Sequence, residues 1–323
     1  MRFIRYASAS GPTLGLVDAE GSITPLDELF QQAIGSRPAL AISVDFVELA
    51  LEDPRLFLAS LDLLRPAIDE ALDVVNLTDL HLEKIEDVRA LPFVDAPEKV
   101  IGVSYNYAKF KKEEGIEGAA DPQVFAKTPS SLLGAETPVR ISTALSQVDY
   151  EAEVGVIIGK TARRVSTEQA AGCIGAYAAV NEMTAKILPR PKFDLETVQV
   201  KLKAIDNFCP MGSVVVTADE WEALGRDIHV NCKVNGESRQ HYPAYDWVHT
   251  PAEVIAFVSG FMTLRPGDVI AMGTSSGVGI AAIPPRLLND GDIVECWIDG
   301  IPGTNNVIRF LGAKAQMRES AHP

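Results

Sequence analysis

Several features that define whole classes of protein are missing from this 323-residue sequence. No uninterrupted apolar run approaches the roughly 18 residues that a membrane-spanning helix needs. The first twelve residues include basic side chains but no apolar segment of the kind found in signal peptides. We therefore expect no membrane partner and, by default, a cytoplasmic location.

Cysteine and histidine are both scarce. The four cysteines, Cys173, Cys209, Cys232 and Cys296, are widely and irregularly spaced and form no CxxC pair. This spacing argues against a disulfide framework and against a zinc site, and it favours reduced, buried thiols. Only five histidines are present, so few side chains can change charge near pH 7.

Basic residues are too few to balance the acidic ones. The chain has 29 Lys and Arg against 44 Asp and Glu, which gives a net charge of −15. Such a chain repels nucleic acid phosphates and anionic membrane surfaces, so we expect neither as a partner. A small anion can still bind where a local cation or a metal ion attracts it.

The pattern of apolar residues divides the chain into two regions. Residues 1–95 combine short strands near 3–6 and 14–17 with an amphipathic helix beyond Pro54, which restarts at Pro66. From Lys99 onwards, short β-branched runs separated by Gly and Pro predict many strands and few helices. We expect a β-rich α+β protein with a small N-terminal domain at 1–95 and a core at 96–323 built on a rolled or barrel-like sheet.

Individual elements of the second region are also expected from their local patterns. Strands are expected at 99–103, 151–158, 213–216, 228–234, 268–272 and 292–298, and helices at 167–173, 218–224 and 251–261. The sequence Thr250-Pro-Ala-Glu253 has the N-cap residue and first-position proline that are typical of a helix start.

Two glutamates, Glu151 and Glu153, lie on one of these expected strands. Side chains alternate along a strand, so both carboxylates point to the same face, with Cβ atoms roughly 6.5–7 Å apart. Buried carboxylates without a partner are costly and tend to be neutralised. A hard divalent cation with oxygen ligands would resolve this, whereas the alternative is a solvent-facing strand edge with two ordinary glutamates.

Four segments stand out in their order along the chain: DYEAEVGVIIGK, KAIDNFCPMG, VNGESRQ and TLRPGDVIAMGTSSGVG. Together they resemble the fumarylacetoacetate hydrolase family, and the match extends over about residues 99–310. The resemblance implies a β-roll core that binds Mg²⁺ or Mn²⁺ through carboxylates, a small α/β N-terminal domain and usually a homodimer. Members of the family cleave or isomerise small 2-oxo and 1,3-diketo acids.

The resemblance also implies roles for individual residues. Glu151 and Glu153 match two metal ligands, and Glu182 stands where the family usually has an aspartate ligand. Lys203 matches the lysine beside metal and substrate, so we expect it to be catalytic. Lys127 is expected on a loop near the substrate. Substrate contacts are implied for Gly273, Thr274, Lys127, Gln240 and Tyr107.

The expected lid, residues 104–115, departs from the family pattern. That segment typically carries NYxxH with a glutamate three residues after the histidine, but here Phe110 replaces the histidine and Glu113 keeps the glutamate position. Phenylalanine cannot activate a water molecule, so hydrolysis would need Glu113 or Glu114 as its catalytic base. The remaining candidate is His241, although an exposed loop residue is the favoured interpretation of that histidine. A second departure is Lys186, which stands where the family usually has arginine.

We therefore predict a divalent-metal-dependent hydrolase that cleaves a C–C bond in a small acylpyruvate or 1,3-diketo acid through a stabilised enolate. The alternative, favoured by Phe110, is a lyase or isomerase acting on a 2-oxo acid: a decarboxylase, dehydratase or tautomerase. A third hypothesis is a non-catalytic relative, but the presence of Glu151, Glu153, Lys203 and Thr274 argues against it.

Overall fold

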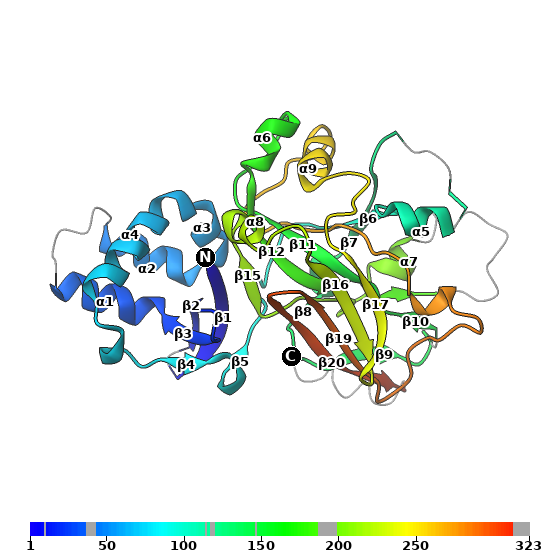
Figure 1. Cartoon of the computed structure of the whole chain (residues 1–323), viewed down its shortest axis with the longest axis horizontal. Coiled ribbons are helices and arrows are strands. Elements are labelled where there is room, and N and C mark those ends of the chain that lie inside the picture. Colours follow the sequence, from blue (N-terminus) through cyan, green and yellow to red (C-terminus); the bar gives the residue numbers. More distant parts are fainter. Residues whose placement is uncertain are drawn as a thin grey trace.

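The computed structural model describes residues 1–9, 11–36, 43–113, 115–116, 120–145, 147–186 and 199–312. The protein is an α+β molecule rich in strands, as predicted (Figure 1). Its described strands form open sheets rather than a closed barrel. None of the described helices is long and apolar enough to cross a membrane.

The first region consists of short strands and four helices. Its strands are β1 (Arg2–Ser8), β2 (Gly11–Val17), β3 (Ser22–Pro25), β4 (Glu83–Lys84) and β5 (Arg89–Ala90). Its helices are α1 (Leu26–Ser36), α2 (Val44–Glu52), α3 (Pro54–Ala59) and α4 (Leu61–Val74). Two short 3₁₀ turns follow, η1 (Leu77–Asp79) and η2 (Ile85–Asp87). The expected amphipathic helix is α4. It continues through Pro66 instead of restarting there, because its buried face packs against the core on both sides of the proline, with Leu64 before it and Ile68 after it.

The second region holds the remaining strands, with shorter helices between them. Its strands are β6 (Val100–Ser104), β7 (Gln123–Lys127), β8 (Leu132–Leu133), β9 (Val139–Ser142), β10 (Val148–Asp149), β11 (Ala152–Ile158), β12 (Ile174–Asn181), β13 (Thr184–Ala185), β14 (Cys209–Pro210), β15 (Val214–Val216), β16 (His229–Val234), β17 (Glu237–Pro243), β18 (Val269–Ala271), β19 (Ile293–Ile298) and β20 (Ile301–Leu311). Its helices are α5 (Ala108–Glu113), α6 (Thr167–Ala171), α7 (Gln199–Lys203), α8 (Ala218–Ala223) and α9 (Pro251–Ser259), with 3₁₀ turns η3 (Pro129–Ser131) and η5 (Gly279–Ala281). All nine elements expected after residue 98 are present, with ends shifted by one or two residues. The predicted helix start at Thr250 is a capping box with Glu253.

One long sheet joins the two regions. Its strand order is β4-β3-β2-β1-β15-β12-β11-β18-β6-β7, with β5 beside β1. The junction is the antiparallel pair β1–β15, in which Arg2 lies opposite Val216. The sheet therefore continues across the boundary expected at residues 95–96, and the division into two domains at that point stays a prediction.

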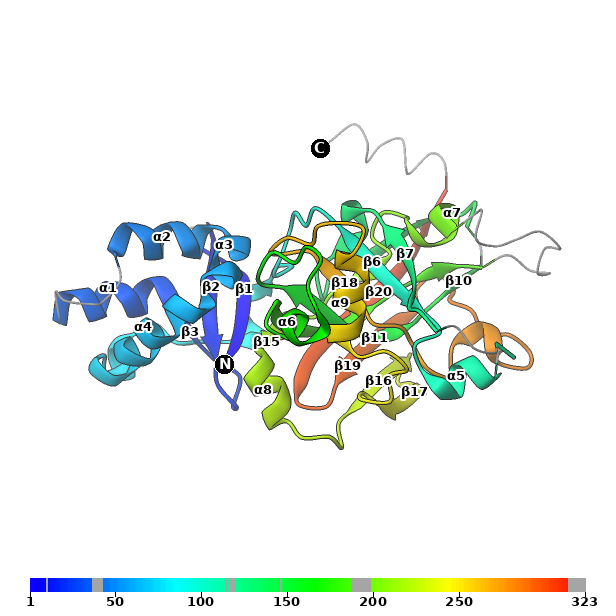
Figure 2. The same cartoon turned by 90° about the horizontal axis from the view of Figure 1, so that it is seen from above.

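Strand β11 at the centre of this sheet is buried on both faces. Val154 and Val156 face a core shared with the second sheet, whose order is β17-β16-β19-β20-β9. Ile157 faces a second core, shared with the helices of the first region. Helices α6 and α9 lie side by side in both views (Figures 1 and 2). The four cysteines are buried free thiols, as predicted.

Candidate active site

Three glutamates meet at one end of strands β11 and β12. Glu151 directly precedes β11, Glu153 is the second residue of that strand, and Glu182 directly follows β12. The two strands pair antiparallel with Ala152 opposite Asn181, which brings these ends together. One carboxylate oxygen from each glutamate lies within 4.8 Å of the others. The three expected metal ligands are therefore close enough to share one cation.

Lysine side chains compensate most of the negative charge of this cluster. Glu151, Glu153 and Glu182 are only 7%, 2% and 1% exposed. Lys203 Nζ lies 2.9 Å from a Glu151 oxygen and also contacts Glu182. Lys186 Nζ lies 2.7 Å from the other Glu151 oxygen. Without these cations, burial of so many carboxylates would be strongly unfavourable.

Glu153 is the member of the cluster with the weakest compensation. Within the described ranges it forms no ion pair, and its hydrogen bond comes from the backbone N–H of Gly273 at 2.7 Å. Burial, together with the charges of Glu182 and Glu151, raises the pKa of Glu153 well above its usual value. For Glu151 the effect of burial is outweighed by Lys186 and Lys203, which hold its pKa below the usual value.

The donor set fits a hard divalent cation. The three candidate ligands offer only carboxylate oxygens, which Mg²⁺ and Mn²⁺ prefer. Burial leaves the pKa of Glu182 raised in spite of two neighbouring lysines, and Glu153 is raised as well. A dication would favour the ionised form of both groups. Although Glu182 replaces the family's usual aspartate, its longer side chain still reaches the cluster.

Lys203 is held in place by its neighbours. Lys127 Nζ donates to the Lys203 carbonyl at 2.5 Å, to the Met183 carbonyl at 3.3 Å and to Glu182 Oε1 at 2.5 Å. Lys203 Nζ also lies 4.9 Å from the centre of the Phe125 ring, a cation–π distance. Burial lowers the pKa of Lys203, but Glu151 and Glu182 outweigh it and raise that pKa, so the side chain is a cation at neutral pH.

The expected loop position of Lys127 is wrong. Lys127 ends strand β7, because this strand pairs with β6 over five residues and places Lys127 opposite Val100. Its side chain is fully buried, and its three hydrogen bonds all go to protein acceptors. The geometry gives Lys127 a positioning role for Lys203, while direct contact with substrate stays a prediction.

A glycine turn after β18 lies against the same end of the sheet. Gly273 has a φ of +92°, and a Cβ atom there would lie 2.7 Å from the Val103 carbonyl, so this position requires glycine. Thr274 Oγ1 donates to the Ala152 carbonyl at 2.9 Å and accepts from Gln240 Nε2 at 2.8 Å. The structure thus brings Gly273, Thr274 and Gln240 together beside Glu153. Their contact with substrate stays a prediction.

Tyr107 lies near the carboxylate cluster: it is 1% exposed, its hydroxyl donates to the Ala244 carbonyl at 3.1 Å, and burial together with the charge of Glu153 raises its pKa well above the usual value. The predicted lid residues are not brought to the cluster by any described contact. Glu113 is exposed at the end of α5, and Glu114 lies outside the described residues. Phe110, at the position of the family's histidine, stacks on Tyr105 with ring centres 6.0 Å apart.

His241 lies on strand β17 rather than on the expected loop. The loop interpretation is wrong because the strand following the NGE turn is paired with β16, where His241 lies opposite Asn231. Its side chain is exposed, as expected, and it stacks on His229 with ring centres 4.2 Å apart. His241 Nδ1 lies 2.8 Å from Asn231 Oδ1. The contacts of His241 with His229 and Asn231 are therefore on the outer surface of the second sheet.

Two further residues make contacts at the site that the sequence analysis did not predict. Lys186 forms an ion pair with Glu151. This pair could have been predicted from the position of Lys186, four residues after Glu182, where the family usually has arginine. Asn106 is fully buried and joins the base of the lid to the glycine turn, since Nδ2 donates to the carbonyls of His249 at 3.0 Å and Met272 at 2.9 Å. Its only sequence signal was its position in the lid motif.

Comparisons with known proteins agree with this geometry. A family model described as "Fumarylacetoacetate (FAA) hydrolase C-terminal" matches residues 99–309. The mitochondrial oxaloacetate tautomerase fahd2 of Xenopus laevis is 28% identical over 286 residues, which are 86% of this chain and 88% of that protein. An uncharacterized protein of Pyrococcus abyssi is 35% identical over 216 residues, 65% of this chain and 92% of the other.

Solved structures give the same result over nearly the whole chain. Maleylpyruvate hydrolase from Sphingobium sp. SYK-6 superposes with a TM-score of 0.71 and 28% identity, covering 96% of this chain and 100% of that one. A structure of that hydrolase in complex with manganese(II) ion and pyruvate has a TM-score of 0.69 and 29% identity over the same shares. Because the family model covers about two thirds of its length, this chain belongs to the fumarylacetoacetate hydrolase family.

Proposed function

We propose that this protein is a divalent-metal-dependent enzyme that stabilises the enolate of a small 2-oxo acid, and that keto–enol tautomerisation is its reaction. One observation carries the proposal: a protonated Lys203 is held between Glu151 and Glu182 in a buried site. The lid bears Phe110 where a hydrolytic base would be expected. The similarity to an oxaloacetate tautomerase over most of the chain supports the same reaction class.

The charges of the site favour an anionic substrate. Four buried carboxyl groups, those of the glutamate cluster and of Asp149, stand against the three lysines Lys127, Lys186 and Lys203. If all are ionised, the local charge is −1, and a bound dication changes it to +1. A 2-oxo acid would therefore be attracted by the loaded site and repelled from the metal-free one.

Lys203 and the glycine turn supply the groups that act on the substrate. Lys203, whose ammonium lies between Glu151 and Glu182, donates a hydrogen bond to a developing enolate oxygen. Thr274 is fixed by its bonds to Ala152 and Gln240, so it can orient the substrate carboxylate. When bound, a divalent cation supplies Lewis-acid stabilisation of the enolate oxygen. Tautomerisation moves one proton from the enol oxygen to the neighbouring carbon, with solvent water accepting one proton and delivering the other, so no protein base has to activate water for attack on carbon.

C–C bond hydrolysis is the second candidate function. It is favoured by the similarity to maleylpyruvate hydrolase over that protein's full length and by Glu113, which keeps the lid glutamate position. Cleavage would also release the enolate of a 2-oxo acid, so Lys203 and the carboxylate cluster would serve both reactions. Hydrolysis additionally requires a base that activates water, and Glu113 would have to approach the cluster from the exposed end of α5.

The two reactions can be separated on one protein preparation with Mg²⁺ or Mn²⁺. Tautomerisation is followed by the loss of enol absorbance of oxaloacetate, and hydrolysis by the release of pyruvate from maleylpyruvate. We expect tautomerisation in the wild type, a roughly 10²–10³-fold loss in Lys203→Met and little change in Glu113→Gln. Lys160→Met, which removes an exposed lysine, is the matched control.

The opposite pattern would replace tautomerisation with hydrolysis as the function. That pattern is release of pyruvate by the wild type without accelerated enol loss, together with a roughly 10²–10⁴-fold loss of this release in Glu113→Gln. A gain of pyruvate release in Phe110→His would show that the lid closes over the cluster in the way the family pattern implies.

A further inference from the structure

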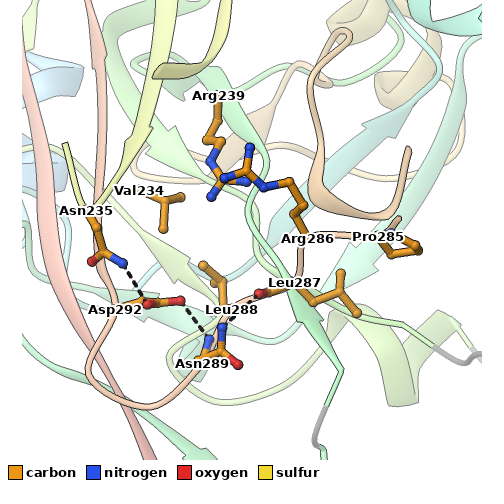
Figure 3. Close-up of a pocket in the computed structure, with 9 residues that line it drawn as sticks. All are labelled: Val234, Asn235, Arg239, Pro285, Arg286, Leu287, Leu288, Asn289 and Asp292. Carbon is orange, nitrogen blue, oxygen red and sulfur yellow. Dashed lines mark hydrogen bonds between the residues drawn. The ribbon is translucent and has the colours of Figure 1, made fainter. Parts of the chain in front are cut away.

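A pocket of about 580 Å³ lies between the β16–β17 hairpin and the segment that precedes β19 (Figure 3). Its volume is in the range of small-molecule sites. None of the residues of the candidate active site lines it. Its polar groups include two arginines from different segments, Arg239 on β17 and Arg286 after η5. Figure 3 shows both guanidinium groups at the same part of the pocket.

The two arginines share one carboxylate and leave a donor unused. Arg286 binds both oxygens of Glu237, at 2.6 and 2.5 Å, whereas Arg239 Nη2 reaches the same side chain only at 3.4 Å. Arg239 Nε is buried and has no hydrogen-bond partner. A buried N–H group without a partner is unfavourable, so an additional acceptor at this position would stabilise it.

The backbone aims Arg239 at this pocket. The pairing of β16 with β17 shifts register after Cys232, so that Gln240 and Ser238 have partners while Arg239 between them has none. Such a bulge redirects a side chain, and bulges are frequent near functional sites. Gly277, with a φ of +100°, packs against this backbone: a Cβ there would lie 2.2 Å from the Arg239 carbonyl.

The acidic residue in the pocket wall, Asp292, forms none of the described ion pairs with the arginines. Asp292 accepts hydrogen bonds from the Asn235 side chain at 2.8 Å and from the Asn289 backbone at 2.7 Å (Figure 3). Both of its oxygens are therefore used to connect the hairpin to the loop before β19. Glu237 is exposed, so a stronger anion can compete with it for the guanidinium groups.

We propose that this pocket binds the oxyanion group, carboxylate or phosphate, of a small metabolite through Arg239 and Arg286. Guanidinium groups donate in a planar fork that matches both kinds of oxyanion, and such charge-assisted bonds are strong. The chain as a whole is acidic, with a net charge of −15, but in this pocket two arginines share one exposed glutamate. The site needs neither the metal nor the carboxylate cluster.

The proposal can be tested on metal-free, full-length protein by calorimetric titration with malonate and, separately, with inorganic phosphate. We expect saturable binding of at least one anion, and the stronger of the two identifies the ligand group. Binding should weaken at least roughly 10-fold in Arg239→Gln and in Arg286→Gln, and it should tighten in Glu237→Gln because the internal competitor is gone. Thermal unfolding of each variant confirms that it is folded, and if Arg239→Gln fails this check, the other two variants decide.

Two control variants separate this pocket from other sources of binding. Arg265→Gln removes an exposed arginine that pairs only with Glu98 among the described ion pairs, and Lys186→Gln removes a cation of the carboxylate cluster. Both should keep the wild-type affinity. The proposal is overturned if neither anion binds up to roughly 10 mM, if Arg286→Gln leaves binding unchanged, or if Lys186→Gln abolishes it.

Discussion

Two lysine–carboxylate pairs in this protein have the same separation and opposite surroundings. Lys127 Nζ lies 2.5 Å from Glu182 Oε1, and the two side chains are 0% and 1% exposed. Lys160 Nζ lies 2.5 Å from Asp62 Oδ2, and these side chains are 50% and 74% exposed. We predict that Lys127→Met strongly destabilises the protein and that Lys160→Met changes its stability little.

The magnitude follows from what each substitution leaves behind. Lys127→Met leaves Glu182 with one lysine instead of two and removes the donor from the carbonyls of Met183 and Lys203. Breaking a buried pair in this way costs roughly 3–5 kcal/mol, whereas an exposed pair contributes about 0–1 kcal/mol. At roughly 2–4 °C per kcal/mol for a domain of 150–250 residues, we expect a fall in Tm of about 6–20 °C for Lys127→Met and at most about 4 °C for Lys160→Met.

The measurement is thermal unfolding of the metal-free proteins, followed by circular dichroism. The double variant Lys127→Met/Glu182→Gln should recover part of the loss, because the remaining buried charge is then removed. Equal falls in Tm for the two single variants would refute the reasoning, since they would mean that burial does not decide the contribution of the pair.

Three further predictions concern the metal, the pH dependence and the assembly. Mn²⁺ titrated calorimetrically into Glu151→Gln/Glu153→Gln should show none of the wild-type binding, because two of three ligand charges are lost; unchanged binding would exclude the site. Arg65, which contacts Asp219 at 2.7 and 2.8 Å, lowers the pKa of Asp219, so this pair stabilises the fold above the ordinary value of 3.8 and its contribution is lost as the pH falls. Asp219→Asn should therefore lower Tm slightly near pH 7, more so at low salt, and this difference should shrink progressively as the pH falls below 3.8; a constant difference would contradict this. Light scattering should give twice the mass of one chain, and a single-chain mass at micromolar concentration would rule out the homodimer.

Local patterns predicted several of the strands and the first step of the site. Short β-branched runs bounded by Gly and Pro define strands such as β11 and β19, because burial on a pleated surface favours those side chains. Strand alternation alone placed Glu151 and Glu153 on one face. The approach of Glu182 depends on the pairing of β11 with β12, which no local pattern contains, and that expectation came from the family resemblance.

The errors have a common cause in long-range contacts. Lys127 ends a strand because β7 pairs with β6, whereas its expected loop position came from the family resemblance. His241 is likewise on a strand only because β16 lies beside it. The resemblance placed Lys203 beside the metal, but the ion pairs of Lys127 and Lys186 with the glutamates were not predicted, since these lysines come from separate segments and meet the cluster only in three dimensions.

The order of synthesis of these segments has a consequence for how the protein folds. Strand β6 lies parallel to β18, with Val100 opposite Val269, and the N–H of Gly273 reaches back to Glu153. On the ribosome, the helices of the first region can form from local contacts and β11 can pair with β12, whereas β11 gains its second neighbour only when β18 and its glycine turn have emerged. The glutamates at the ends of these strands are synthesised early, but they become enclosed only when the later segments pack against them. Assembly of the candidate active site therefore belongs to the slow, non-local stage of folding.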